Sequence, residues 1–265
     1  MRKFVSVNGA VLNCAFDGPS NGIPLVFVNP LGTGLRIWDD VIESLSDRYP
    51  IIRYDKRGHG LSDGPPGPFF IHDHAKDLAA LLDSLGMREV VLVGSSIGGM
   101  IALDFAAGHP QRVQALILGD TAAKIGTAEY WNERIGNIRQ KGMAAMLEVI
   151  LLRWFAADFQ HKQPAAYQGY ANLLARTDLE GYLTACAAIR DADLRDVLPG
   201  ILCPTLVLCG AEDSATPPEL VRGLADELQN SRFQLIPDAG HTPSVEHPEA
   251  MADAIIAFLG EIGRG

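Results

Sequence analysis

Long hydrophobic segments are absent from this chain of 265 residues. No apolar run approaches the roughly 20 residues that a membrane-spanning helix needs. The N-terminal stretch from Met1 to Asn8 carries two basic residues but then alternates like a strand, and no apolar signal-peptide core follows it. We therefore expect no secretion signal and no membrane partner.

Cysteine is also scarce, with four residues in the whole chain: Cys14, Cys186, Cys203 and Cys209. None of them forms a C-x-x-C motif, and none has metal-ligand spacing with a histidine. We interpret each as a small buried apolar residue. The sequence thus predicts no metal site and favours the reducing cytoplasm.

Basic residues are outnumbered, because 22 Lys and Arg face 32 Asp and Glu for a net charge of -10. A nucleic-acid partner or an anionic membrane surface requires clustered Lys and Arg, so we expect neither. A small anionic ligand would need a local basic pocket. The length and the 48% hydrophobic content suit one domain with a large core, or one domain with a sizeable insertion.

What the chain does contain is a series of short apolar runs separated by helical patterns. Unbroken runs are typical of strands buried on both faces of a parallel sheet, and their alternation with helices predicts a doubly wound α/β fold. Asn8-Gly9 between two alternating segments, 3–7 and 11–16, predicts a hairpin. The expected parallel strands are 25–28, 51–54, 90–93, 115–118, 205–209 and 233–236, and the expected helices are 38–45, 75–85, 97–107, 218–228 and 248–259.

One long segment breaks the alternation, since no strand pattern occurs between Thr121 and Leu198. Apolar residues from Met143 to Trp154 recur at helical spacing, and 163–174 and 179–189 also indicate helices. We therefore predict a core domain made of 1–120 and 199–265, with a helical cap inserted at 121–198.

Gly94-Ser95-Ser96-Ile97-Gly98 stands between the 90–93 run and the 97–107 helix. A strand, then G-x-S-x-G, then a helix is the nucleophile-elbow pattern. Its sharp turn needs small neighbours, and the helix N-terminus directs free N–H groups at any oxyanion that forms there. The sequence thus predicts Ser96 as a catalytic nucleophile.

A serine nucleophile needs a base and a group that orients the base. His241 lies in a turn-rich loop just after the 233–236 run, where the active-site edge of the sheet is expected, so we predict it as the base. Asp213 and Asp120 each follow a strand and satisfy the Ser–acid–His order; the pattern alone leaves both open as the acid. The backbone N–H groups of Ile97 and Leu31 are the expected oxyanion-hole donors, because Pro30 has none to offer.

Together these residues resemble the α/β-hydrolase family over nearly the whole chain. Segment 55–62, Asp-Lys-Arg-Gly-His-Gly-Leu-Ser, is similar to that family's D-x-R-G-x-G-x-S motif, which implies a structural role for His59. The family's acid usually follows the strand before the last, so the resemblance favours Asp213 over Asp120. The resemblance implies an α/β-hydrolase fold with a mostly parallel twisted sheet and helices on both faces.

A narrower resemblance, to 3-oxoadipate enol-lactonases, is carried by segments 29–33, 94–100, 121–129, 153–155 and 213–218. Those enzymes of aromatic catabolism use no cofactor and hydrolyse an unsaturated lactone that bears a carboxylate. The chain departs from their usual pattern at Pro30 and at 242–244. An anionic lactone would need cations in its pocket, and the expected substrate-binding residues are Lys124, Arg134, Arg153 and Trp154.

Three other functions are compatible with the same pattern. Cofactor-free haloperoxidases and carbon–carbon bond hydrolases share the fold and a similar triad, and some chains of this fold serve as small-ligand receptors. Haloalkane dehalogenases and epoxide hydrolases are disfavoured, because they need a carboxylate where this chain has Ser96. The sequence does not specify the oligomeric state.

Overall fold

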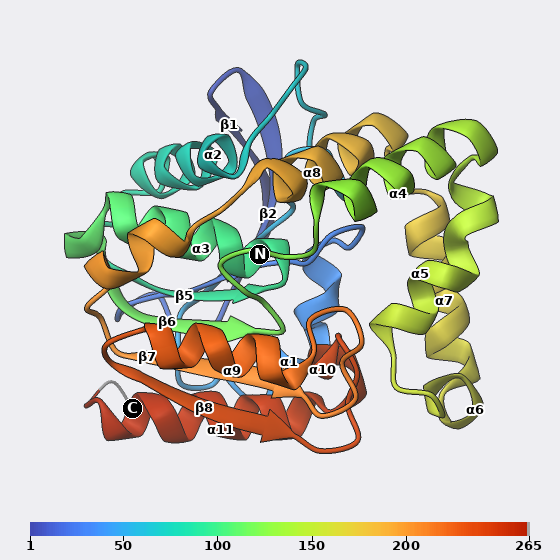
Figure 1. Ribbon diagram of the computed structural model, residues 1–265. Helices are drawn as coiled ribbons and strands as arrows, with labels where there is room; N and C mark the ends of the chain where they lie inside the picture. The colour runs from blue at the N-terminus through green and yellow to red at the C-terminus, as the bar shows by residue number, and fades with distance from the viewer. Residues whose placement is uncertain (264–265) are drawn as a thin grey trace.

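The computed structural model describes residues 1–263, and its centre is an eight-stranded sheet of order β1-β2-β4-β3-β5-β6-β7-β8 (Figure 1). Strands β1 and β2 run antiparallel to their neighbours, whereas β4, β3, β5, β6, β7 and β8 are mutually parallel. The α/β prediction is confirmed. The strands are β1 Arg2–Val7, β2 Ala10–Asp17, β3 Leu25–Val28, β4 Ile51–Tyr54, β5 Val90–Ser95, β6 Val113–Gly119, β7 Thr205–Gly210 and β8 Ser231–Ile236.

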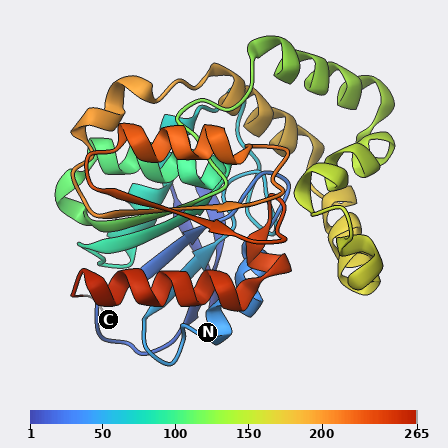
Figure 2. The same ribbon diagram turned by 60° about the horizontal axis from the view of Figure 1, so that its bottom comes forward.

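The central strands are buried on both faces, which is why their sequences are unbroken apolar runs. In β3, Val26 and Val28 face one hydrophobic cluster while Leu25 and Phe27 face the other. Figure 2 shows the two helical layers that cover the sheet. Helices α2 (Ile71–Ser84), α3 (Ile97–Gly108) and α9 (Pro218–Glu227) pack on the first face, and α1 (Asp39–Glu43) and α11 (Pro248–Glu261) on the second.

The predicted hairpin joins β1 and β2 through Asn8 and Gly9, whose φ angles of 46° and 73° are the positive values that a tight primed turn requires. The helix expected at 38–45 is shorter than predicted. A 3₁₀ turn, Leu35–Trp38, precedes α1, and α1 ends at Glu43. The other predicted helices of the two layers are present with shifts of a few residues at their ends.

Five helices lie between β6 and β7 and extend beyond the sheet on the side where the parallel strands end (Figures 1 and 2). They are α4 Ala128–Lys141, α5 Leu147–Trp154, α6 Phe159–Lys162, α7 Pro164–Ala175 and α8 Leu179–Asp191. Helix α4 has no counterpart in the sequence-based prediction. The expected stripe from Met143 to Trp154 is divided into a 3₁₀ turn, Met143–Met146, and α5.

No helix in residues 1–263 is both long and apolar enough to cross a membrane. All four cysteines are free thiols, and Cys14, Cys186 and Cys209 are buried as predicted. The prediction is wrong for Cys203, which is partly exposed because it lies in the turn before β7 rather than inside a strand.

The parallel strands place five loops at one edge of the sheet. Residues 29–34 follow β3, Ser96 follows β5, Asp120 follows β6, and the loops containing Asp213 and His241 follow β7 and β8. Because the carboxyl ends of parallel strands meet at the same edge, these segments converge although they are far apart in the sequence.

Candidate active site

Ser96 occupies a strained turn between β5 and α3. Its φ of 55° and ψ of -122° are unfavourable for a residue with a side chain, and the side chain is almost fully buried. A Cβ on Gly94 would overlap the carbonyl of Gly98, and a Cβ on Gly98 would overlap that of Val28, so the turn requires both glycines. The backbone N–H of Ser96 donates to Gly119 O at 3.0 Å, and Thr121 Oγ1 donates to Ser96 O at 2.7 Å. The turn is thus fixed by its backbone.

His241 contacts Asp213, the acid that the family resemblance favoured. The imidazole Nδ1 lies 2.8 Å from Asp213 Oδ2, and both side chains are buried. A carboxylate accepts the hydrogen bond, so Nδ1 carries the proton and Nε2 is left as an acceptor. This is the tautomer that a general base needs.

Asp213 is held by a dense set of donors. Its Oδ1 accepts from the backbone N–H groups of Ala215 (2.7 Å) and Thr216 (3.0 Å), and its Oδ2 also accepts from Thr216 Oγ1 at 2.6 Å. Burial acts to raise the pKa of Asp213, but the charge and hydrogen bond of His241, together with the Thr216 bonds, lower it below the usual value. Asp213 therefore stays ionised.

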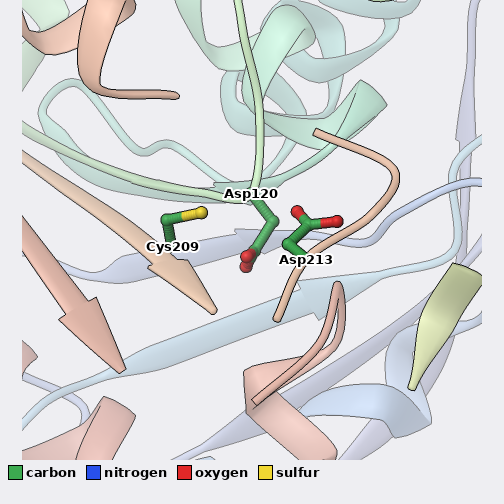
Figure 3. Close-up of side chains that lie close together, drawn as sticks. All are labelled: Asp120, Cys209 and Asp213. Carbon is green, nitrogen blue, oxygen red and sulfur yellow. The ribbon is translucent and has the colours of Figure 1, made fainter. Parts of the chain in front are cut away.

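Asp120, the alternative acid, lies beside Asp213 but has a different environment (Figure 3). Its Oδ1 accepts from the backbone N–H of Gly210 at 2.8 Å, and it makes no hydrogen bond to His241. Burial and the nearby charge of Asp213 raise the pKa of Asp120 well above its usual value, although the Gly210 bond acts against this. Two close buried carboxyl groups do not both ionise, and here Asp120 is the protonated one.

Cys209 completes this buried cluster, with ligand atoms of Cys209, Asp120 and Asp213 all within 4.8 Å of one another (Figure 3). A cation would need ionised donors that are free to bind it. Burial and the two carboxyl groups raise the pKa of the Cys209 thiol, Asp120 is protonated, and Asp213 is engaged by His241 and Thr216. These donors do not fit a metal, and we interpret the cluster as support for Asp213.

The backbone N–H groups of Leu31 and Ile97, the expected oxyanion donors, are both available. Ile97 is the first residue of α3, so its N–H has no partner within the helix. Within residues 1–263 the Leu31 N–H has no protein acceptor either. Leu31 and Ser96 line the same cavity.

That cavity has a volume of about 240 Å³ and lies between the sheet edge and the inserted helices. Ser96 and His241 form part of its wall on the sheet side. The wall on the side of the insertion is mostly apolar and aromatic, with Ile125, Tyr130, Trp131, Ile150, Trp154 and Ile189.

Three of the four expected substrate-binding residues, Arg134, Arg153 and Trp154, line the cavity. The Arg134 guanidinium donates to the hydroxyl groups of Tyr182 and of Tyr130, the latter at 2.9 Å, and it lies over the Trp131 ring at 5.4 Å from the centroid. Its Nε is buried and has no partner in the described residues. Neither Arg134 nor Arg153 forms a salt bridge with a carboxylate of residues 1–263, and Arg153 donates to Ala215 O at 3.4 Å.

Lys124 does not line the cavity, so the structure does not bring it together with the other three expected substrate-binding residues. Its side chain is exposed and forms an ion pair with Asp193 at 3.3 Å. The loop before α4 turns Ile125 inward toward the cavity, and this directs the preceding side chain to the surface.

Sequence reasoning missed several residues that shape this site. Tyr130 and Tyr182 hold Arg134, and Thr216 bonds both Asp213 and His241. Glu246 accepts from the N–H groups of Gly240 (2.9 Å) and Ala156 (2.7 Å), which ties the His241 loop to the end of α5. Thr216 follows Asp213 closely, and Tyr130 stands one helical turn before Arg134, so both could have been suspected as supports. The contacts of Tyr182 with Arg134 and of Glu246 with Ala156 join distant segments and left no local signal.

Comparisons with known proteins give a consistent result. A family model described as alpha/beta hydrolase fold matches residues 23–248. The chain is 34% identical to 3-oxoadipate enol-lactonase 2 of Acinetobacter baylyi over 96% of this chain and 95% of that protein. Among solved structures, it resembles the enol-lactonase from Burkholderia xenovorans LB400 with a TM-score of 0.94 and 36% identity, over 97% of this chain and all of the other. A malate-bound thermophilic esterase from Thermogutta terrifontis matches with a TM-score of 0.90 and 30% identity over 99% of each chain.

Proposed function

The chain belongs to the α/β-hydrolase family, and on this premise we propose that it is a cofactor-free serine hydrolase that cleaves a small ester or lactone. The main support for the proposal is that Ser96, His241 and Leu31 line one cavity, with Asp213 bonded to His241 Nδ1 and with the Ile97 N–H, free of any partner in its helix, directly after Ser96.

In this mechanism His241 Nε2 takes the proton of Ser96 as Oγ attacks the substrate carbonyl. The carbonyl oxygen becomes negative and accepts from the N–H groups of Leu31 and Ile97. Asp213 stabilises the imidazolium. The imidazolium then protonates the leaving oxygen, and in a lactone this oxygen stays attached to the acyl chain. Water activated by His241 then attacks the acyl-enzyme, and the acid is released.

We propose that residues 121–198 act as a cap on the core formed by 1–120 and 199–265. Their helices supply the apolar and aromatic wall that faces Ser96, and this wall keeps bulk water from the acyl-enzyme and selects the substrate. The contacts of Glu246 hold the end of α5 against the His241 loop, so the wall and the base are positioned together.

We further propose that the substrate carries a carboxylate. The cavity lining includes Arg134 and Arg153 but no acidic residue, in a protein whose net charge is -10. A partly buried guanidinium without an acid partner is a ready partner for a carboxylate, which it can bind with two parallel hydrogen bonds. The malate bound by the esterase relative and the enol-lactonase names of the others are compatible with 3-oxoadipate enol-lactone as the substrate.

Steady-state kinetics with a substrate panel tests this assignment. The panel contains 3-oxoadipate enol-lactone, simple butyrolactones, short esters, a dienoate ring-cleavage product, and acetate with peroxide and bromide. We expect kcat/KM for the enol-lactone to exceed that of the neutral lactones by at least about a hundredfold, or roughly 2.7 kcal/mol. Equal rates on neutral esters would reject the proposal that the substrate carries a carboxylate. Faster dienoate cleavage or bromination would reject the proposal that the protein is an ester or lactone hydrolase.

Replacing Arg134 with Met should raise KM for a carboxylate-bearing lactone by about 10- to 100-fold, because one charge-assisted contact is lost. The KM for a neutral ester should stay within about threefold. The matched control is Arg139→Met, since Arg139 lies on the same helix but is exposed. If Arg134→Met changes KM equally for both substrates, Arg134 only supports the packing of the cavity wall and does not bind the substrate carboxylate.

A further inference from the structure

Lys56 is an almost fully buried lysine that the proposed mechanism does not use. It follows β4, and its side chain is only 1% exposed. Its Nζ donates to the carbonyl oxygens of Pro30 at 2.7 Å and Asn29 at 3.1 Å. Within residues 1–263 it forms no salt bridge, because the oxygens of the adjacent Asp55 accept from other groups. The ammonium is therefore directed at the loop after β3.

The carbonyl of Pro30 belongs to the peptide that carries the Leu31 N–H. Peptide bonds are planar, and this chain has no cis peptide among its described residues, so the C=O and N–H of one unit point in opposite directions. The Pro30 oxygen faces Lys56, and Thr33 Oγ1 also donates to it at 2.9 Å. The Leu31 N–H therefore points away from Lys56, and Pro30 and Leu31 both line the cavity that contains Ser96.

We propose that Lys56 is a positioning residue that orients and polarises the Pro30–Leu31 peptide and thereby strengthens the Leu31 N–H as an oxyanion donor. This inference rests on the proposed function. Hydrogen bonds in series polarise one another, and a positive charge behind the donor has its largest effect where little water screens it. Negative charge appears on the substrate oxygen only in the transition state, so Lys56 accelerates the reaction without tightening substrate binding.

Packing alone does not explain an ammonium at this position. Burial penalises the ammonium and lowers the pKa of Lys56, although the charge of Asp55 and the two carbonyl oxygens that accept from Nζ stabilise the charged form. A methionine would fill nearly the same volume without that cost. The loop also has ties that do not involve Lys56: Gly32 N–H donates to His59 Nε2 at 3.0 Å, and Asn29 Nδ2 donates to Thr33 O.

The test compares Lys56→Met, Lys56→Gln and the control Lys76→Met, since Lys76 lies on the exposed surface of α2. The substrate is a neutral p-nitrophenyl ester, and the probe is a boronic acid, which binds a serine nucleophile as an anionic tetrahedral adduct. We expect Lys56→Met to lower kcat by about 10- to 100-fold, with KM within about threefold. Affinity for the boronic acid should fall by a similar factor. Lys56→Gln keeps N–H donors but no charge and should fall between wild type and Lys56→Met, whereas Lys76→Met should match wild type.

The outcomes distinguish failure of the Lys56 inference from failure of the proposed hydrolase function. If Lys56→Met keeps its kcat and boronate affinity within about twofold, or if it changes KM alone, this inference is wrong. If Lys56→Met does not fold, as judged by its thermal unfolding, Lys56→Gln decides by the same criterion. An inactive wild type, or a Ser96→Ala variant as active as wild type, would instead reject the proposed function and this inference with it.

Discussion

Replacing Ser96 with Ala is expected to abolish ester hydrolysis, lowering kcat by about 10⁵- to 10⁶-fold, because the hydroxyl group that His241 activates to form the acyl-enzyme is lost. The fold should survive, since the elbow is fixed by the hydrogen bonds of the Ser96 backbone to Gly119 O and Thr121 Oγ1 and not by the Ser96 hydroxyl. We expect the free energy of unfolding to change by less than about 1 kcal/mol. Turnover of a p-nitrophenyl ester and thermal unfolding measure the two effects.

The matched control is Ser95→Ala. Ser95 is the neighbouring buried serine at the end of β5, but it does not line the cavity. Its removal should leave kcat within about threefold. Residual turnover by Ser96→Ala near that of wild type would mean that the hydrolysis does not pass through this serine.

The second large effect is expected for Asp213→Asn, which should lower kcat by about 10⁴-fold. An amide facing His241 Nδ1 favours the tautomer in which Nε2 carries the proton, and that imidazole cannot act as a base. Asp120→Asn should lower kcat by less than about tenfold, because Asp120 is already neutral and an amide oxygen can still accept from Gly210 N–H.

Comparing these two variants in pre-steady-state and steady-state assays decides which carboxyl group orients His241. A larger loss for Asp120→Asn than for Asp213→Asn would reverse the assignment. Both should be folded, since each substitution preserves shape; thermal unfolding provides the check.

The fold was predictable because its determinants are local. The runs at 25–28, 90–93 and 205–209 are buried on both faces, and that burial is what makes each sequence continuously apolar. Helix α4 was not predicted, because little of it is buried. It buries only Trp131 and Ile138, so its sequence is mostly polar and shows no clear apolar stripe.

The candidate site was predictable where a short motif fixes the geometry, as at Ser96 and its two glycines. It was not predictable where function depends on segments far apart in the chain. Nothing near Lys56 in the sequence indicates that its ammonium meets the carbonyl of Pro30. Likewise, Lys124 and Arg134 are both cationic residues of the same segment, and only the path of the loop before α4 directs Lys124 to the surface and leaves Arg134 at the cavity.

The choice between Asp120 and Asp213 shows the same limit. Both follow parallel strands and reach the same edge of the sheet, so strand order cannot separate them. They differ in their neighbours: His241 and Thr216 stabilise the charge of Asp213, whereas Asp120 is buried beside that charge and stays protonated. The family resemblance favoured Asp213 because the acid of that family usually follows the strand before the last, and this regularity cannot be derived from the sequence of this chain alone.

We expect Ser96 to become acylated during turnover. The most direct measurement is mass spectrometry of the enzyme after rapid acid quenching during hydrolysis of a p-nitrophenyl ester, followed by proteolysis and peptide sequencing. We predict a mass increase equal to the acyl group on Ser96, which forms as fast as the nitrophenol burst and is absent in Ser96→Ala. Turnover without any acyl adduct, or with the adduct on another residue, would contradict a mechanism in which Ser96 is the nucleophile.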